Sequence, residues 1–328
     1  MAHRIFLYAP YFSNSGPALV NKNLVTCLQD TVAIIHFKNR YLQRIEVLLN
    51  ILWANTIVIS ALGFHDYEIK LAILLGRKII YIMHGFGKDD SPLVESRERF
   101  LMPRADLILC VSGMFCQKAK EAYPQFADRM NVLFNGVDWN GIKHSIGDFS
   151  MKQDVNEIVL IGGGRRIKNN LNVCNAVSRI NDQNGTRYHI SVFGQYSDSD
   201  ESPMIANISC VAYVGIVSHE ELLKKLASSA LVVQNSDLES FGLSVIEALV
   251  AGCSILVSQH VGANDIITGL EEMDVINDPS DIEELSNKIH HVMMNANNER
   301  LLSSINYHES SIEFAAEKLL CFCNDLYE

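Results

Sequence analysis

The chain has 328 residues, which is long for one hydrophobic core and sufficient for two domains of ordinary size. Hydrophobic residues make up 48% and charged residues 20% of it, the balance of a soluble globular protein. The formal net charge is −11, which argues against nucleic acid as a partner, because such binding needs Lys and Arg to neutralise phosphates. Any basic cluster in this chain is therefore local and informative.

The cysteines and the apolar stretches indicate a cytoplasmic protein. None of the eight cysteines forms a C-x-x-C pair, and most lie in apolar runs, as buried free thiols do. The N-terminus lacks the apolar core of a secretory signal. The segment 45–64 is interrupted by Glu46 and is predicted to be a helix followed by a strand. Because Arg40 and Arg44 precede this helix, an amphipathic contact with a membrane surface is a second interpretation.

The first half of the chain alternates short apolar runs with amphipathic stretches. The predicted strands are 4–10, 32–37, 56–60, 78–83, 106–111 and 131–133. Helices are predicted from Pro17, over 68–75 and over 113–123. This alternation implies a parallel sheet covered on both faces. The small-residue loop that contains Ser15 and Gly16 follows the first strand, at the sheet edge where ligands bind in such folds.

A second series of strands and helices begins after the Asn135–Asp138 segment and a polar passage. The predicted strands are 157–161, 189–193, 209–213, 231–234 and 254–257, and the predicted helices are 169–180, 219–227, 243–251 and 312–327. We therefore expect two α/β domains, residues 1–145 and residues 146–311. Residues 312–328 would form a C-terminal helix that is long enough to pack back on the first domain.

A glycine-rich basic turn, GGGRRIK, follows the predicted strand 157–161. It brings Arg165, Arg166 and Lys168 to the start of a helix, where the macrodipole is already positive. That arrangement is unfavourable unless an anion is bound, so the turn indicates a diphosphate site. Its spacing fits neither a dinucleotide fingerprint nor a P-loop. A solvated basic turn is the simpler alternative.

Two glutamates, Glu239 and Glu247, stand eight residues apart in the segment DLESFGLSVIEALVAG. Glu247 lies on a mostly apolar predicted helix with no Lys or Arg three or four residues away. Its carboxylate therefore needs donors from elsewhere, and the vicinal hydroxyls of a ribose would supply two. The helix also begins with unpaired backbone N–H groups, which favour an anion; these belong to Phe241, Gly242 and Leu243. Alternatively, Glu239 caps the helix and Glu247 is solvated.

His84 ends the predicted strand 78–83 and precedes Gly85. A single His after an apolar strand is usually structural, but its place at the carboxyl end of a strand favours a ligand contact. Neither His84 nor His65 pairs with another His, Cys or carboxylate at metal-ligand spacing, so we expect no metal site.

Five segments, taken in order, resemble glycosyltransferase family 4, whose GT-B fold has two Rossmann-like domains facing across a cleft. They are 105–112, 135–138, the basic turn, 214–222 and 239–253. The match is strong in the second half of the chain and loose over the first 100 residues. The resemblance implies transfer of a sugar from a nucleotide diphosphate, with retention of configuration and without a metal or other cofactor.

The resemblance also implies roles for individual residues. The catalytic set would be His84 near the reacting centre, Glu239 on the sugar hydroxyls, and Lys168 with Arg165 or Arg166 on the diphosphate. The remaining donor-binding positions would be Ser15, Gly16, Gly164, Val214, Phe241, Gly242, Leu243 and Glu247. Among these, Glu247 would bind the ribose and the Val214 backbone would border the base.

These roles imply a hexosyltransferase that moves a sugar from a UDP-sugar, in preference to a GDP-sugar, to a hydroxyl of a glycan or lipid-linked acceptor. Surface polysaccharide or glycolipid synthesis would be its pathway, in the cytoplasm or peripherally on the cytoplasmic face of the membrane. No nucleophilic carboxylate can be assigned, which agrees with front-side attack. A catalytically inactive nucleotide-sugar-binding partner protein is the alternative, and an epimerase is disfavoured because its acid and base cannot be named. The sequence does not indicate the oligomeric state.

Overall fold

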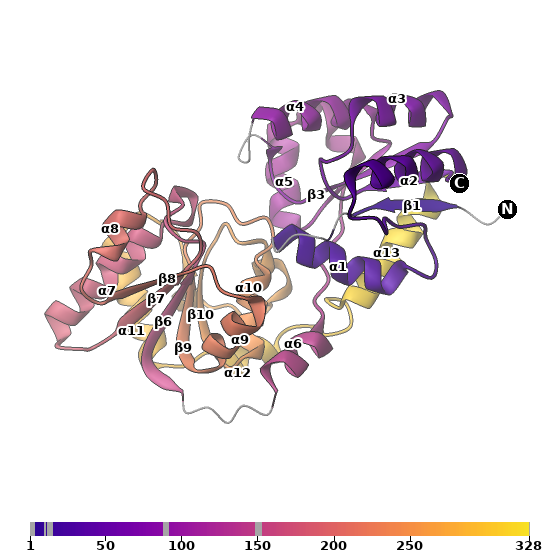
Figure 1. The fold of residues 1–328 in the computed structure, drawn as a ribbon. Coiled ribbons are helices and arrows are strands. Elements are labelled where there is room, and N and C mark those ends of the chain that lie inside the picture. The colour runs from indigo at the N-terminus through magenta and orange to yellow at the C-terminus, as the bar shows by residue number, and fades with distance from the viewer. Residues whose placement is uncertain (1–3, 10, 12–15, 88–91, 148–152, 328) are drawn as a thin grey trace. The chain divides into compact units, whose positions relative to one another are not determined.

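The computed structural model describes residues 4–9, 11, 16–87, 92–147 and 153–327. The chain divides into two α/β units, each built on a parallel sheet (Figure 1). Unit 1 comprises Met1–Asp138 together with His308–Glu328, and unit 2 comprises Trp139–Tyr307. The expected junction at 145/146 lies seven residues beyond the observed one, because helix α6 (Trp139–Ile146) packs on helices of unit 2.

The sheet of unit 1 follows the strand order β1-β2-β3-β4-β5. Its strands are β1 (Ile5–Tyr8), β2 (Thr56–Ile59), β3 (Lys78–Met83), β4 (Leu107–Cys110) and β5 (Met130–Val132). The strand predicted at 32–37 is wrong as a strand, since it makes only one parallel bridge, between Ala33 and Phe6. The backbone N–H groups of His36 and Phe37 instead donate to the Glu46 carboxylate, at 3.0–3.2 Å. They are therefore not available to the sheet.

The helices of unit 1 cover this sheet. They are α1 (Gly16–Leu28), α2 (Arg40–Trp53), α3 (Asp66–Leu74), α4 (Pro92–Leu101), α5 (Gly113–Ala122) and α13 (Ile312–Asp325). Helix α2 begins where Asn39 accepts the N–H groups of Tyr41 and Leu42, as an N-cap residue does. The segment 45–64 is thus a helix followed by a strand, as predicted. Within the described ranges, no helix is long and apolar enough to cross a bilayer.

The C-terminal helix α13 belongs to unit 1 and packs against α1 (Figure 1). Its entry is set by a bridge between Val137 and Ser311. A side chain at Gly136 would overlap the backbone of Ile312, so the close approach requires glycine. At the other end, the Thr56 hydroxyl donates to the Tyr327 hydroxyl at 3.1 Å.

The sheet of unit 2 follows the order β11-β10-β9-β6-β7-β8, and all of its strands are parallel. The strands are β6 (Asp154–Ile161), β7 (His189–Phe193), β8 (Val211–Gly215), β9 (Ser229–Gln234), β10 (Ser254–Ser258) and β11 (Val275–Ile276). The chain moves outward from β6 to β8 and then returns to the other side of β6 as β9. In open α/β sheets, ligands bind at the carboxyl ends of strands at such a reversal. The fold therefore points to the loops after β6 and β9.

The remaining helices belong to unit 2. They are α7 (Asn170–Asn184), α8 (Ser202–Ala206), α9 (His219–Ala227), α10 (Leu243–Val250), α11 (Ile282–Met294) and α12 (Asn298–Ser303). Apolar side chains of α7 and α11, among them Val177 and Ile289, are fully buried with Leu160 of β6. This packing forms the core on one face of the sheet.

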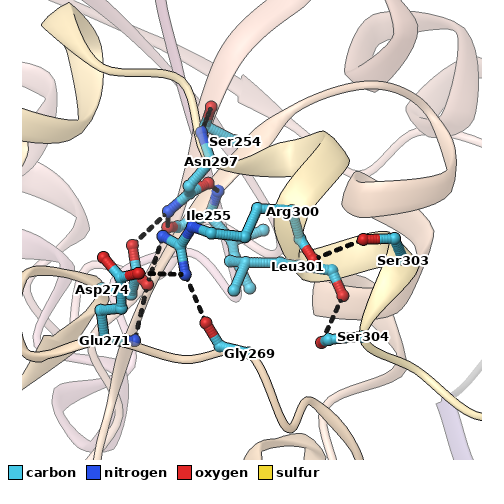
Figure 2. A network of polar contacts seen from close by, with 10 residues as sticks. All are labelled: Ser254, Ile255, Gly269, Glu271, Asp274, Asn297, Arg300, Leu301, Ser303 and Ser304. Carbon is cyan, nitrogen blue, oxygen red and sulfur yellow. Dashed lines mark hydrogen bonds and ion pairs between the residues drawn. The ribbon is translucent and has the colours of Figure 1, made fainter.

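A polar network around the buried residues Asp274 and Asn297 closes the opposite, amino edge of this sheet (Figure 2). The Asn297 amide accepts the N–H of Ile255 at 3.0 Å and donates to the Ile255 carbonyl at 2.9 Å. It also donates to Asp274, at 2.7 Å, and Arg300 pairs with the same carboxylate at 2.8 Å. Because Asp274 is buried, these partners satisfy a charge that would otherwise be costly. The network fixes the start of β10 to the start of α12.

Candidate donor-binding site

The turn after β6 can form only with glycine at its centre. Gly162 and Gly163 have φ angles of +110° and +64°, which residues with a side chain rarely adopt. Both N–H groups donate to the Phe193 carbonyl at the end of β7, at 2.7 and 2.9 Å. A Cβ atom at Gly163 would lie 2.6 Å from the carbonyl oxygen of Gln195. The turn therefore lies against the next strand and presents the basic residues that follow it.

The structure separates the three predicted cations of this turn. Lys168 is buried, its stem lies against Gly162, and its ammonium group forms an ion pair with the Glu239 carboxylate. Arg165 and Arg166 are exposed, and the Arg165 side chain donates to the Gly162 carbonyl at 3.2 Å. Lys168 is therefore the inward-facing cation, and the two arginines flank it at the surface.

The loops after β6 and β9 are hydrogen-bonded to each other at the sheet reversal. The N–H of Asp237 donates to the Ile167 carbonyl at 2.9 Å, and the Asn169 amide donates to the Asp237 carboxylate at 2.7 Å. Glu239 is held from the other side, because its N–H donates to the His260 carbonyl at 2.9 Å. The Lys168–Glu239 ion pair thus sits in a rigid frame and not on free loops.

The N-terminus of α10 lies next to Glu239 along the chain. Gly242 begins it with a φ angle of +95°, and a Cβ atom there would lie 3.1 Å from the Glu239 side chain. Among the residues that the structure describes, the N–H groups of Phe241, Gly242 and Leu243 have no acceptor. Such a helix end favours a bound anion. The Glu239 carboxylate accepts from the Lys168 ammonium group and the Gln234 amide, and among the described residues no N–H group of α10 donates to it, so the interpretation of Glu239 as a capping acid is wrong.

Glu247 is buried on α10, and its carboxylate has a side-chain partner. Its Oε1 atom lies 2.8 Å from Nε2 of His219, the first residue of α9. The sequence predicted that this carboxylate needs a donor from elsewhere, but it did not identify His219. The signal was present, since His219 follows β8 and so lies at the same carboxyl edge of the sheet. Burial also rules out the alternative in which Glu247 is solvated.

The other predicted positions of unit 2 occupy the same edge. Gly164 is buried, and a side chain there would overlap Ser202. Val214 lies near the end of β8, and both it and Ile216 are exposed. An exposed apolar pair at a strand end offers a surface for a flat, weakly polar group.

In unit 1, His84 follows β3 and lies in an apolar pocket also lined by Ser60, Asn135 and Gly136. Its Nε2 atom is 2.9 Å from the Ser60 hydroxyl, which donates its proton to Asn21 at 2.7 Å. His84 therefore donates to Ser60. Burial lowers the pKa of His84 to about 4, so the ring is neutral at neutral pH.

Two further predicted positions concern the loop after β1. Ser15 lies outside the described residues, whereas Gly16 is the first residue of α1. The role predicted for this loop stays a prediction.

One cluster in the described part of the chain has the residue types of a metal site, at the amino edge of the unit 2 sheet. His189 lies 2.9 Å from Glu157 and 3.1 Å from Asp154. The ammonium group of Lys225 lies 2.9 Å from the same Glu157 oxygen as His189. Because the Lys225 ammonium group already pairs with the buried Glu157 carboxylate, the cluster forms an ion-pair network. The sequence did not predict it, because its members come from distant segments.

The family described as Glycosyl transferases group 1 matches residues 145–308, half of the chain. The chain therefore belongs to this family. The match covers unit 2 from residue 145 to its end, with every site residue described in it.

Individual relatives are distant. An uncharacterized glycosyltransferase of Methanocaldococcus jannaschii is 23% identical over 197 residues, which are 56% of this chain and 50% of that protein. The chain thus spans about half the length of this curated relative.

Solved structures are similar over nearly the whole chain. HepE of Anabaena, in complex with UDP-glucose, has a TM-score of 0.70 at 14% identity and covers 98% of this chain and 99% of its own. Sucrose-phosphate synthase from Thermosynechococcus elongatus has a TM-score of 0.69 at 15% identity, with 99% of each chain covered. These similarities confirm the predicted α/β fold with two parallel sheets, as in GT-B glycosyltransferases.

Proposed function

We propose that the protein is a retaining glycosyltransferase of family 4 that transfers a sugar from a UDP-sugar to a hydroxyl of a glycan or lipid-linked acceptor. The observation that carries this proposal is the Lys168–Glu239 ion pair at the sheet reversal, next to the open N-terminus of α10. A nucleotide sugar has a diphosphate and a hydroxyl-rich ring joined at one carbon. Lys168 would bind the diphosphate on one side of that carbon, and Glu239 would accept the sugar hydroxyls on the other side.

The phosphate side of the proposed site is cationic. Lys168 and the N–H groups of Phe241, Gly242 and Leu243 would bind the diphosphate, with Arg165 or Arg166 at the surface. As the bond from the anomeric carbon to the phosphate oxygen breaks, its electron pair moves to the phosphate. Hydrogen-bond donors and cations that are already in place stabilise this growing charge, and so they lower the energy of the transition state more than that of the bound substrate.

The ribose side depends on Glu247. One of its oxygens is held by His219, and no described residue donates to the other. That oxygen would accept the ribose hydroxyls, while His219 fixes the orientation of the carboxylate.

The structural neighbours support a UDP donor. HepE is described with UDP-glucose, and a trehalose-phosphate synthase from Burkholderia xenovorans with a TM-score of 0.67 is described as UDP-forming. In the proposed reaction the acceptor oxygen bonds to the anomeric carbon on the face from which UDP leaves, and the acceptor proton passes to the departing phosphate. His84 would hydrogen-bond the sugar as a neutral ring. We propose that the reaction needs no metal ion and takes place in the cytoplasm, within surface polysaccharide or glycolipid synthesis.

Calorimetric titration with UDP, GDP and a panel of their sugars tests the proposal, together with a UDP-release assay on glycan and lipid-linked acceptors. We expect UDP binding that Lys168→Ala weakens at least tenfold. Lys224→Ala is the matched control, because that lysine forms an exposed ion pair with Glu220 one turn away. If no nucleoside diphosphate binds, the site assignment is wrong. If UDP-sugars bind but no donor and acceptor pair turns over, the protein is an inactive nucleotide-sugar-binding partner.

A further inference from the structure

Helix α2 is apolar on both of its sides. Val47 and Ile51 are fully buried against unit 1, which is what a helix on a sheet requires. The outer side is nevertheless a stripe of exposed large apolar residues: Tyr41, Leu42, Ile45, Leu49, Leu52 and Trp53. Tyr41 is 84% exposed. The six side chains are 43–84% exposed among the described residues, so the packing of the described part of unit 1 does not account for this second apolar side.

The neighbouring helix α3 carries further exposed apolar residues. The two helices contact each other and lie side by side (Figure 1). Tyr67, Ile73 and Leu74 of α3 are exposed, Leu74 by 82%, and so is Phe37 just before α2. We call these ten residues the α2–α3 surface. More than half of the exposed large apolar side chains in the described chain belong to it, and a concentration of this kind marks an interaction site.

The charge around the α2–α3 surface is opposite to that of the whole chain. Residues 37–78 contain six Lys and Arg and three Asp and Glu, in a protein with a net charge of −11. Two of the three acids already have partners, and so do two of the six cations: Arg44, and Lys78, which pairs with Asp106 at 3.0 Å. Glu68 is fully buried and pairs with Arg44 at 3.0 Å, and Glu46 accepts N–H groups of the backbone. Lys38, Arg40 and Lys70 are exposed, and so is one acid, Asp66, so the exposed charge beside the surface is positive on balance.

Exposed apolar side chains next to exposed Lys and Arg favour one kind of partner. Apolar side chains on a helix lying in the interface, with Lys and Arg beside them, are the features that bind an anionic lipid surface. Tyr41 and Trp53 stand near the two ends of α2, and their rings suit the boundary between lipid and water. A second copy of the chain fits less well, because a two-fold interface would set the same cations against each other.

We propose that the α2–α3 surface docks the protein peripherally on anionic membranes, with α2 lying in the plane of the headgroups. At 14 residues, the helix would be about 21 Å long and would lie on the bilayer without spanning it. The inference does not depend on the proposed enzymatic activity. If that activity holds, docking would bring a lipid-linked acceptor to the same surface as the enzyme.

Vesicle co-sedimentation tests the proposal, with vesicles of phosphatidylcholine alone or mixed with phosphatidylglycerol. We expect binding to the mixed vesicles that falls as salt is raised. Ile45→Glu combined with Leu49→Glu should weaken it by roughly 100-fold, because two apolar side chains that would insert into the lipid are replaced by charges. Both positions are exposed, so the melting temperature should stay unchanged. Met294→Glu, an exposed apolar position in unit 2, is the matched control.

Three results would overturn the inference. Equal binding to both vesicle types would show that anionic lipid is not required. Unchanged binding of the double variant would show that α2 does not make the contact. If vesicles are not bound at all, analytical ultracentrifugation decides what covers the surface. A dimer that the double variant dissociates would identify a second copy, and a monomer would leave the surface without the function we assign to it.

Discussion

Replacing Glu239 with glutamine should move UDP affinity and turnover in opposite directions. The substitution keeps the shape of the side chain and removes the negative charge that contacts the Lys168 ammonium group. In the wild-type protein this carboxylate competes with the incoming diphosphate for Lys168. In the variant, no carboxylate at position 239 competes with the diphosphate for Lys168.

The expected size of the effect follows from Coulomb's law. Two unit charges about 5–6 Å apart interact with about 3 kcal/mol at an effective dielectric constant near 20. Because the Glu239 side chain is 22% exposed, salt and water reduce the repulsion between it and the diphosphate to about 1 kcal/mol. UDP should therefore bind about fivefold more tightly to Glu239→Gln. Sugar transfer should fall by about 100- to 1,000-fold, since the carboxylate that accepts the sugar hydroxyls is lost.

Titration calorimetry with UDP and steady-state UDP release measure the two quantities on the same preparations. Lys168→Ala is the informative comparison, because it should lower both UDP affinity and turnover. The reasoning is refuted if Glu239→Gln binds UDP more weakly than the wild type while its melting temperature is unchanged. In that case Glu239 would support the diphosphate and would not compete with it.

Three further outcomes can be checked by urea denaturation at several pH values. Gly163→Ala should cost about 2 kcal/mol or more of stability, since its Cβ would clash with Gln195; Gly185→Ala, with nearly the same φ angle but open space around it, should cost clearly less. Asp274→Asn should cost about 2–3 kcal/mol and leave UDP affinity unchanged, because its network lies at the opposite edge of the sheet. Since the pKa of His84 is lowered to about 4 from 6.5, the free energy of unfolding should fall as the pH drops from 6.5 towards 4, by at most about 1.4 kcal/mol per pH unit. The His84→Gln variant should lack that slope, and an equal slope in the variant would contradict the assignment.

The sequence was most informative where the physical cause of a structure is local. Continuous apolar runs predicted β3 and β7 with their observed bounds, because strands buried on both faces leave little choice of residue. Helix α9 also has its predicted bounds, helped by the capping box between Ser218 and Glu221. The two-residue strand β11 was missed, because so short a pattern carries no periodicity.

The contacts within the site could not be predicted in the same way. Lys168 and Glu239 are 71 positions apart, and they meet only because β9 lies beside β6 in the sheet. The order of strands in a sheet is set by long-range packing, and the spacing of residues along the sequence does not reveal it. The same limit applies to α2, which has apolar residues on two of its sides. Burial of Ile51 and exposure of Leu49 depend on which side faces the sheet.

The return of α13 to unit 1 has a consequence for the order of folding during synthesis. All of unit 2 leaves the ribosome before Ile312–Asp325 does, and domains made early tend to fold as units while the rest follows. Until then, the face of α1 that α13 covers and the backbone around Gly136 remain open to other chains. A chain that ends at residue 307 and has left the ribosome would therefore carry all of unit 2 and an incomplete unit 1. At that stage, chaperones would be expected to hold the first unit and to leave the second alone.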